Sequence, residues 1–274
     1  MTADSGVGWF ERAETDDPVH EGRADRPREW PALAVERGFA ADESEYYRRL
    51  REATLAAARG TVAEREGADD QQLVSAVRAL DDCARTANEL TERVAEWAGT
   101  RDPEATVDLG YARELAGREP ETPVEERVIS LATRVVALDD ERAQLRAYIE
   151  RTAPEVAPNL AALAGPVLAT RLVALAGGLE SLAKQPSSTV QVLGAEEALF
   201  AHLRGGADPP KHGVIYTHEA VRGTAREHRG SAARALAGKL TIAARIDHYS
   251  GEPNPDLAAE LEERIERIRA RDAS

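Results

Sequence analysis

The residues best suited to chemistry in this chain form a short run of a lysine, a histidine and a tyrosine. Lys211 and His212 follow Pro209-Pro210, and Tyr216 comes four residues after His212. A cation beside stackable rings in a Gly/Pro-rich loop suits an unpaired nucleic-acid base next to a phosphate. An ordinary solvated loop has the same composition, so these residue types alone leave both interpretations open.

The segment around this run is basic, although the chain as a whole is acidic. The 274 residues include 49 acidic and 35 basic side chains, a net charge of −14. Segment 183–249 holds nine basic and six acidic residues, together with all three lysines and five of the six histidines. A basic island in an acidic chain indicates a polyanion site. A random fluctuation in a short window is the alternative.

Other kinds of chemistry are poorly represented. A single cysteine, Cys83, excludes an internal disulfide framework and a cysteine-rich zinc site. No catalytic triad order, phosphate loop or metal-ligand spacing stands out, and His212, His218 and His228 are best interpreted as loop and surface residues. No apolar run reaches about 18 residues and the first twelve residues lack a secretory pattern. We therefore expect a cytoplasmic protein without a membrane span, catalytic residues, metal or cofactor.

The composition also predicts the environment. Only three of the 35 basic residues are lysines. An acidic, Ala-rich and Lys-poor chain is typical of an extreme halophile, and an acidic mesophilic protein is the alternative. In molar salt the Debye length is only about 3 Å, so the net charge says little about partners.

Helical periodicity predicts a mostly all-α fold with four parts. Residues 1–66 form a short, partly ordered N-terminal module with a helix over 43–66, capped by Asp42 or Ser44. Residues 67–154 form a coiled-coil hairpin. Its first helix begins at Asp69 or Asp70, its second begins with Thr122 as cap and stops at Pro154, and a short helix lies between them.

The two long helices carry apolar residues at alternating gaps of three and four, the seam of a coiled coil. We expect the hairpin to dimerise through this seam, because an isolated hairpin exposes a wide apolar flank. Packing within one chain is the alternative. The seam residues are Leu73, Val77, Leu80, Val128, Leu131, Val135, Leu138, Leu145 and Ile149.

The sequence of residues 155–250 predicts a compact domain of short helices, with helix breaks at 165–166 and 177–178. We expect a polar loop over 184–189, a helix over 195–203, a short extended segment over 214–216, and a helix over 231–246 capped by Ser231. Residues 251–274 are interpreted as a charged helix in a solvated tail. Arg222, Arg226 and Arg229 recur at gaps of four and three, which would place them on one helix face suited to phosphates. A solvated face is the alternative.

Four blocks of residues resemble the Nop domain family in their order and spacing. The run 90–97 also resembles the first coiled-coil helix of that family, and the similar proteins are the archaeal Nop core proteins of box C/D small ribonucleoproteins, homologues of the eukaryotic nucleolar Nop pair. The blocks are Ala157-Pro158-Asn159-Leu160 through Leu179, Gln191 through Phe200, Pro210 through Tyr216, and Arg234 through Asp247.

The resemblance implies an RNA-binding scaffold rather than an enzyme. Such a scaffold binds a kink-turn guide RNA of the box C/D type together with a ribosomal-type kink-turn-binding protein. It recruits the methyltransferase fibrillarin for guide-directed 2′-O-methylation of ribosomal or transfer RNA, and it dimerises through its coiled coil. The methyl donor binds fibrillarin, so no cofactor is expected here. A helical protein-interaction adaptor with a Nop fold but no direct RNA binding is the alternative.

The expected RNA-binding residues combine the basic side chains with a helix start at 194–196. Free backbone N–H groups at that start can meet phosphate, although an ordinary helix start is the alternative. The full set is Lys184, Gly194, Ala195, Glu196, Lys211, His212, Tyr216, Arg222, Arg226, Arg229 and Lys239.

The chain departs from the family pattern in two ways. Glu197 and Ala201 stand where the family usually has Lys and often Arg, so specificity should rest on shape, stacking and a surface shared with the kink-turn protein. The family also has a fibrillarin-binding α/β domain before the coiled coil, whereas only about 65 residues precede it here. Trp9, Phe10 and Trp30 are our expected fibrillarin surface.

Overall fold

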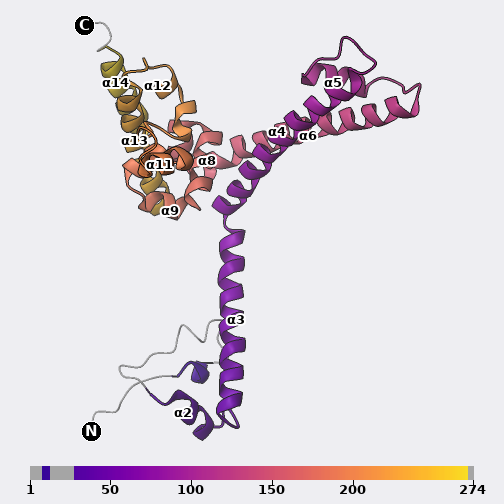
Figure 1. The fold of residues 1–274 in the computed structure, drawn as a ribbon. Coiled ribbons are helices and arrows are strands. Elements are labelled where there is room, and N and C mark those ends of the chain that lie inside the picture. Colours follow the sequence, from indigo (N-terminus) through magenta and orange to yellow (C-terminus); the bar gives the residue numbers. More distant parts are fainter. Residues whose placement is uncertain (1–7, 13–27, 271–274) are drawn as a thin grey trace. The chain divides into compact units, whose positions relative to one another are not determined.

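The computed structural model describes residues 8–12 and 28–270 (Figure 1). The chain divides into two units, 1–68 and 69–274, each with its own internal contacts. Every regular element within the described ranges is a helix. This confirms the expected all-α fold.

The first unit is a small module built around aromatic rings. It contains η1 (Trp9–Arg12), α2 (Trp30–Glu36) and α3 (Glu43–Gly67). Asp42 caps α3 by accepting from the Glu45 N–H at 2.8 Å, as expected. Trp9 packs edge-on against Phe39 at 5.2 Å between ring centroids, and its indole N–H donates to the Tyr46 hydroxyl at 3.2 Å.

These contacts correct the expected fibrillarin surface. Trp9 and Phe10 are only 8% and 6% exposed because they form the interior of the module, and Trp30 is partly buried against them. The remainder of the expected module, residues 1–7 and 13–27, lies outside the described residues.

The second unit begins with the expected helical hairpin. Its long helices are α4 (Asp69–Ala98) and α6 (Pro123–Val156), and the short α5 (Leu109–Ala116) packs on α6. The Thr122 hydroxyl caps α6 by accepting from the Glu125 N–H at 3.2 Å. Pro154 does not stop α6, which continues to Val156.

Six of the nine seam residues are buried inside one chain, as in the alternative of packing within one chain. Leu73, Val77 and Leu80 of α4 are buried against Ile149 of α6, with Leu145 partly buried beside them. Nearer the turn of the hairpin, Val128 and Val135 pack against α4 and α5, with Leu131 partly buried, and Leu138 is half-buried. The six buried side chains are therefore occupied within the hairpin.

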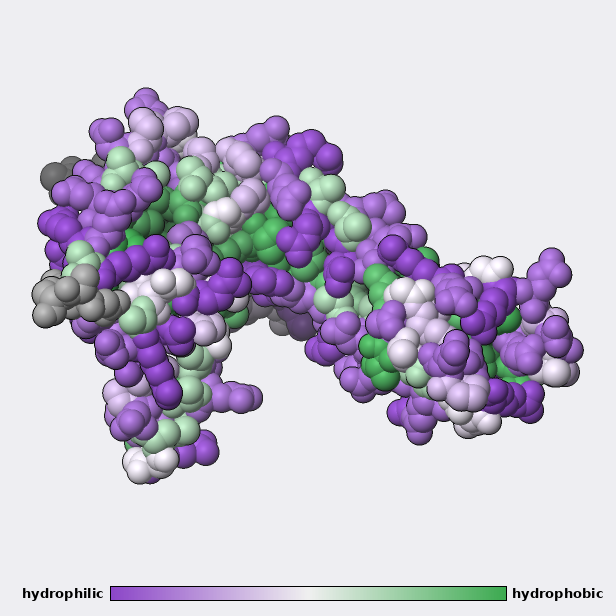
Figure 2. All heavy atoms as spheres, turned by 90° about the horizontal axis from the view of Figure 1, so that it is seen from above, coloured by the Kyte–Doolittle hydropathy of each residue, from purple (hydrophilic) through white to green (hydrophobic). Residues whose placement is uncertain are grey.

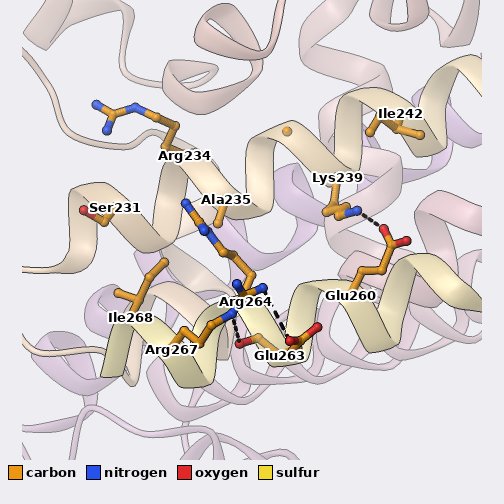
Figure 3. Close-up of a pocket in the computed structure, with 11 residues that line it drawn as sticks. Ser231, Arg234, Ala235, Lys239, Ile242, Glu260, Glu263, Arg264, Arg267 and Ile268 are labelled. Atoms are coloured by element: carbon orange, nitrogen blue, oxygen red, sulfur yellow. Dashed lines mark hydrogen bonds and ion pairs between the residues drawn. The ribbon is translucent and has the colours of Figure 1, made fainter. Parts of the chain in front are cut away.

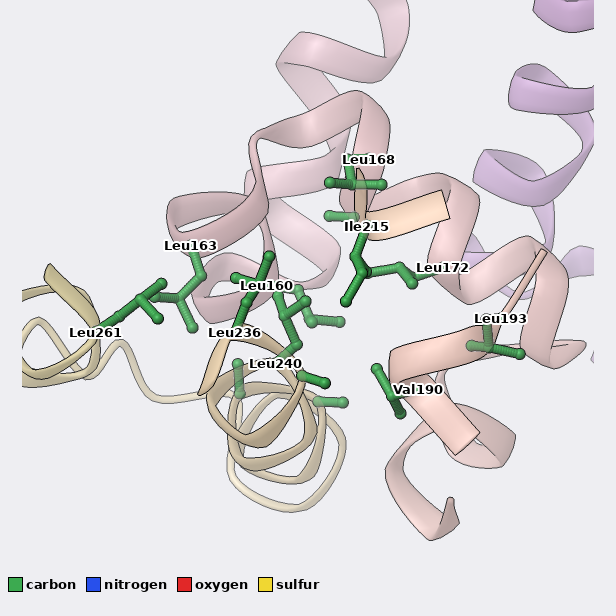
Figure 4. Close-up of a cluster of buried hydrophobic side chains, with 14 of the residues drawn as sticks. Leu160, Leu163, Leu168, Leu172, Val190, Leu193, Ile215, Leu236, Leu240 and Leu261 are labelled. Carbon is green, nitrogen blue, oxygen red and sulfur yellow. The ribbon is translucent and has the colours of Figure 1, made fainter. Parts of the chain in front are cut away.

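The rest of the second unit is a compact helical domain around α13 (Figure 1). Leu236 and Leu240 of α13 lie at its centre, among leucines from α7, α8 and α14 and Ile215 from η2 (Figure 4). The elements are α7 (Pro158–Ala164), α8 (Pro166–Ala176), α9 (Leu179–Lys184), α10 (Ser187–Val192), α11 (Glu196–Leu203), η2 (Val214–Thr217), α12 (Glu219–Arg222), α13 (Arg229–Tyr249) and α14 (Asp256–Arg269).

A buried carboxylate ties the two ends of this domain together. Asp247 of α13 accepts from the backbone N–H groups of Asn159 and Leu160, both at 2.9 Å, at the start of α7. The Asn159 amide donates to Asp247 at 2.7 Å and to the Glu252 carbonyl at 2.9 Å. Asp247 thereby satisfies N–H groups that a helix start leaves without partners.

Four local expectations in this domain were wrong. The expected polar loop at 184–189 becomes helical at Ser187, and 214–216 is a turn of 3₁₀-helix rather than extended. Ser231 lies inside α13, which begins at Arg229. The expected solvated tail is instead α14, which buries Leu257, Leu261, Ile265 and Ile268 in the domain core.

No single helix among the described residues is long and apolar enough to cross a membrane. Helices α7 and α8 reach the necessary length only together, and the chain bends by 117° between them. Much of their apolar surface is buried in the domain core.

Candidate nucleic-acid interface

The predicted Lys211–His212 run is fixed to the end of α10 by three hydrogen bonds. The Gln191 amide donates to the Lys211 carbonyl at 2.8 Å, and the Gly213 N–H donates to the Gln191 carbonyl at 2.9 Å. The Val214 N–H donates to the Leu193 carbonyl at 2.7 Å. The loop backbone is therefore held in place while the Lys211 side chain remains exposed.

Two glycines make this close approach possible. A Cβ atom on Gly213 would lie 1.9 Å from the Leu193 carbonyl oxygen, so no other residue fits there without moving the backbone. Gly194 has φ +80°, and a Cβ there would lie 3.3 Å from that of Val214. Glycine tolerates both the positive φ and the backbone contact.

His212 and Tyr216 form a stack at this site. Their ring centroids are 4.6 Å apart with planes inclined by 23°, and the Arg229 guanidinium carbon lies 5.4 Å from the Tyr216 centroid. Burial lowers the pKa of His212, and the nearby positive charges of Arg229 and Lys211 lower it further. The lowered pKa favours the neutral imidazole, which suits stacking on a base.

Two of the three backbone N–H groups that we expected to be free at the helix start 194–196 have partners. The Gly194 N–H donates to the Glu196 carboxylate at 2.8 Å, and the Ala195 N–H donates to the Val192 carbonyl at 2.9 Å. Glu196 and Glu197 also place two negative charges in the first turn of α11. A phosphate at this position would meet repulsion rather than a vacant anion site.

The three arginines do not share a helix face, which corrects the expectation from their spacing. Arg222 ends α12, Arg226 lies in the following turn, and Arg229 begins α13. Arg229 Nε donates to the Thr224 carbonyl at 3.0 Å, so it braces the turn and the Tyr216 ring. Arg222 pairs with Glu219 at 3.1 Å, whereas Arg226 is exposed.

The other two predicted lysines lie away from the stack. Lys184 ends α9 and pairs with Glu180. The carbonyl of the preceding residue, Ala183, accepts from Arg245 Nε at 3.1 Å, which places Lys184 near Arg245 of α13. Arg245 is about 22 Å along α13 from Gly230 at the rise of an α-helix. Lys239 lies on another part of α13 and pairs with Glu260 of α14.

An exposed apolar surface beside the loop was missed by the sequence analysis. Helix α11 has no buried residue, and its Phe200 and Leu203 are 58% and 70% exposed. Leu175 is 44% exposed, and its Cδ1 would lie 3.4 Å from a Cβ atom added to Gly194. The exterior is mostly hydrophilic (Figure 2), and two exposed apolar side chains one turn apart on α11 indicate a protein-binding surface. The missed signal was an apolar stretch in a helix without a counterpart to cover it.

Comparison with known proteins relates the second unit to one family. The family model described as Nop, "snoRNA binding domain, fibrillarin", matches residues 69–269. An uncharacterized NOP5 family protein of Methanocaldococcus jannaschii is 38% identical over 237 residues, which is 73% of this chain and 57% of the relative. Nucleolar protein 58 of Schizosaccharomyces pombe is 33% identical, covering 72% of this chain and 46% of that protein.

A solved structure is similar over a larger share of the chain. A chain in the crystal structure of a fibrillarin/Nop5p complex has a TM-score of 0.55 and 26% sequence identity, covering 93% of this chain and 91% of that one. The present chain spans about half the length of the curated relatives that it matches. The family match also includes α14, in agreement with its packing in the domain core.

Proposed function

Because this chain belongs to the Nop family, we propose that it is a non-enzymatic, cytoplasmic scaffold of a box C/D guide ribonucleoprotein. In this proposal it binds kink-turn RNA already held by a ribosomal-type kink-turn protein. It then recruits fibrillarin for guide-directed 2′-O-methylation. The observation that carries the proposal is the His212–Tyr216 stack, with exposed Lys211 beside it, on a loop fixed by two required glycines.

The two neighbouring surfaces match the two components of such a partner. The stack and Lys211 offer a ring for an unpaired base and a cation for phosphate. We assign the exposed apolar side chains of α11 to contact with the kink-turn protein, because exposed apolar side chains of this kind mark interaction surfaces. The acids Glu196 and Glu197 fit this division, since they disfavour phosphate next to α11.

The proposal is tested with a box C/D kink-turn RNA in the presence and absence of its kink-turn protein. We expect the full chain to bind only the RNA–protein complex. Lys211→Glu should weaken this binding and lower its salt dependence, with a change of about one in the slope of log K against log salt for a phosphate contact. Arg85→Glu, an exposed arginine of the hairpin, is the matched control.

The variant Phe200→Ser separates the two halves of the surface. It should lower affinity for the RNA–protein complex without changing the salt slope, since an apolar contact releases no counterions. Unchanged binding by Lys211→Glu and loss only by Phe200→Ser would instead support the adaptor that binds protein and not RNA.

Fibrillarin recruitment and homodimerisation belong to the same proposal. Since Trp9 and Phe10 are interior, the exposed Tyr47 and Val35 are the better candidates in the first unit for fibrillarin contact, at 53% and 36% exposure. Of the seam residues, Leu131, Leu138 and Leu145 are only partly buried and remain available for contact in a dimer.

A further inference from the structure

A groove between α13 and α14 carries an unusual concentration of positive charge for this acidic chain. Its volume is about 650 Å³, and its lining includes four basic and two acidic side chains (Figure 3). The basic residues are Arg234 and Lys239 of α13 and Arg264 and Arg267 of α14. Small residues on α13, among them Ser231, Ala235 and Gly238, leave room for a ligand to approach the helix.

The cations of this groove are only partly neutralised. Lys239 pairs with Glu260, and Arg267 lies at 3.6 Å from the Glu263 carboxylate, a long and weak contact. Arg264 is exposed and forms no ion pair with a described residue, and it extends from α14 toward Ala235 of α13 (Figure 3). A guanidinium that lies over a groove without a carboxylate partner is suited to phosphate.

The groove continues from the stack at the start of α13. The Lys211 side chain lies within about 4 Å of where a Cβ of Gly230 would be, and Gly230 precedes Ser231, the first groove residue of α13. Arg234 follows Gly230 by one helical turn and stands on the same face. From Gly230 to Ile242 the helix covers about 18 Å, which is long enough to contact several successive phosphates.

We propose that the α13–α14 groove is a second phosphate-binding surface, which takes the sugar–phosphate backbone of the RNA where it runs on from the Lys211–His212 loop. The proposal rests on the proposed function, because the loop sets where the RNA enters. It assigns to α14 a role in RNA binding, with Arg264 and Arg267 as the contacts. Glu260 and Glu263 restrain affinity, since their carboxylates compete with phosphate for the same cations.

The test compares a minimal kink-turn RNA with the same RNA extended by about one helical turn of duplex at either end, both bound to the kink-turn protein. The wild-type chain should bind an extended RNA more tightly than the minimal one. Arg264→Glu/Arg267→Glu should remove at least about tenfold of this gain and lower the salt slope by about two, without affecting the minimal RNA. Arg85→Glu is the matched charge control, and melting curves confirm that the variants fold.

Glu263→Gln tests the groove in the opposite direction, because it removes a carboxylate that competes with phosphate. A residue with only a structural role would not improve binding when it is replaced. Glu263→Gln should tighten binding to the extended RNA alone. If the double variant binds both RNAs as the wild type does, the groove assignment is overturned and the proposed function stands. If the wild-type chain binds neither RNA, both are overturned.

Discussion

At the scale of single residues, the close approach of Gly213 to the Leu193 carbonyl helps to fix the position of the candidate interface. The loop can lie against Leu193 only because Gly213 has no side chain. The space at this position therefore requires glycine. The position of the Lys211–His212 loop depends on this close contact as well as on its three hydrogen bonds, all between segments about 20 residues apart in the sequence.

Gly213→Ala tests this contact. The added methyl group would overlap the Leu193 carbonyl oxygen, so the loop must shift and the free energy of unfolding should fall by about 1–3 kcal/mol. Affinity for the kink-turn complex should fall as well, because the stack moves. Gly206→Ala in the same loop is the control, since a Cβ there makes only an ordinary contact at 3.5 Å. Equal effects of the two substitutions in urea unfolding and RNA binding would contradict the steric explanation.

His218 is expected to make stability depend on pH. Its Nδ1 accepts from the Ala220 N–H at 3.1 Å, and its Nε2 lies 3.0 Å from the Leu163 carbonyl, so the neutral ring satisfies both groups. Burial lowers the pKa of His218 below its ordinary value of about 6.5, against smaller raising effects from Leu163 and Glu219. The stabilisation is therefore complete above that ordinary value and is lost as pH falls through the lowered value in the folded state.

Urea unfolding at pH 7.5 and pH 5 measures this loss. The wild-type chain should lose about 1 kcal/mol through the helix cap of α12. His218→Asn keeps a capping acceptor that does not titrate, and should remove that part of the pH dependence. An identical pH profile in the variant and the wild type would show that His218 is not its source.

At the scale of elements, α14 distinguishes a core helix from a tail. Leu261 is 6% exposed and packs in the main core of the domain. Leu261→Ala should lower the free energy of unfolding by about 2–4 kcal/mol, since it leaves a cavity. The adjacent and exposed Glu262→Ala should change it by no more than about 0.5 kcal/mol. Comparable, small effects of both substitutions in chemical denaturation would restore the solvated-tail interpretation.

The same helix shows what the sequence could and could not predict. The hairpin, its Thr122 cap and the breaks at 165–166 and 177–178 were predicted because local signals determine them. The burial of α14 was missed, although Leu257, Leu261, Ile265 and Ile268 recur at gaps of four, four and three and so share one face among eight charged residues. Pro154 failed as a stop because the last turn of α6 carries Ala153 into the core, and the Ala157 N–H closes on the Ala153 carbonyl at 2.8 Å.

The candidate site was predicted by residue type and only partly by geometry. Lys211, His212 and Tyr216 do come together, because they lie within six residues on one loop. Arg222, Arg226 and Arg229 were assigned a shared face from spacing alone, which fails once the chain turns at Gly223. The bond between Gly194 and Glu196 could not be foreseen, since an i to i+2 contact through a carboxylate leaves no periodic signal.

At the scale of the whole molecule, we expect the buried residues of the hairpin seam to contribute to stability rather than to association. Leu80 is 2% exposed and packs against α6 of the same chain. Leu80→Ala should therefore lower the free energy of unfolding by about 2–5 kcal/mol and leave the molar mass from light scattering unchanged. Arg85→Ala on the outer face serves as the control for both measurements. A halved mass at unchanged stability would instead assign Leu80 to a dimer interface.

The tie between Asp247 and the start of α7 has a consequence for how the protein is made. Residues 159–160 obtain their partners from positions 87 to 95 residues later in the chain. At about 5–20 residues per second, the ribosome needs roughly 5–20 s to synthesise that interval. During this time the N–H groups at the start of α7 and the apolar faces that α13 and α14 will cover are open to chaperones and proteases. A nascent chain arrested before Asn254 leaves the exit tunnel should be cleaved readily in this domain, and one arrested well beyond it should resist.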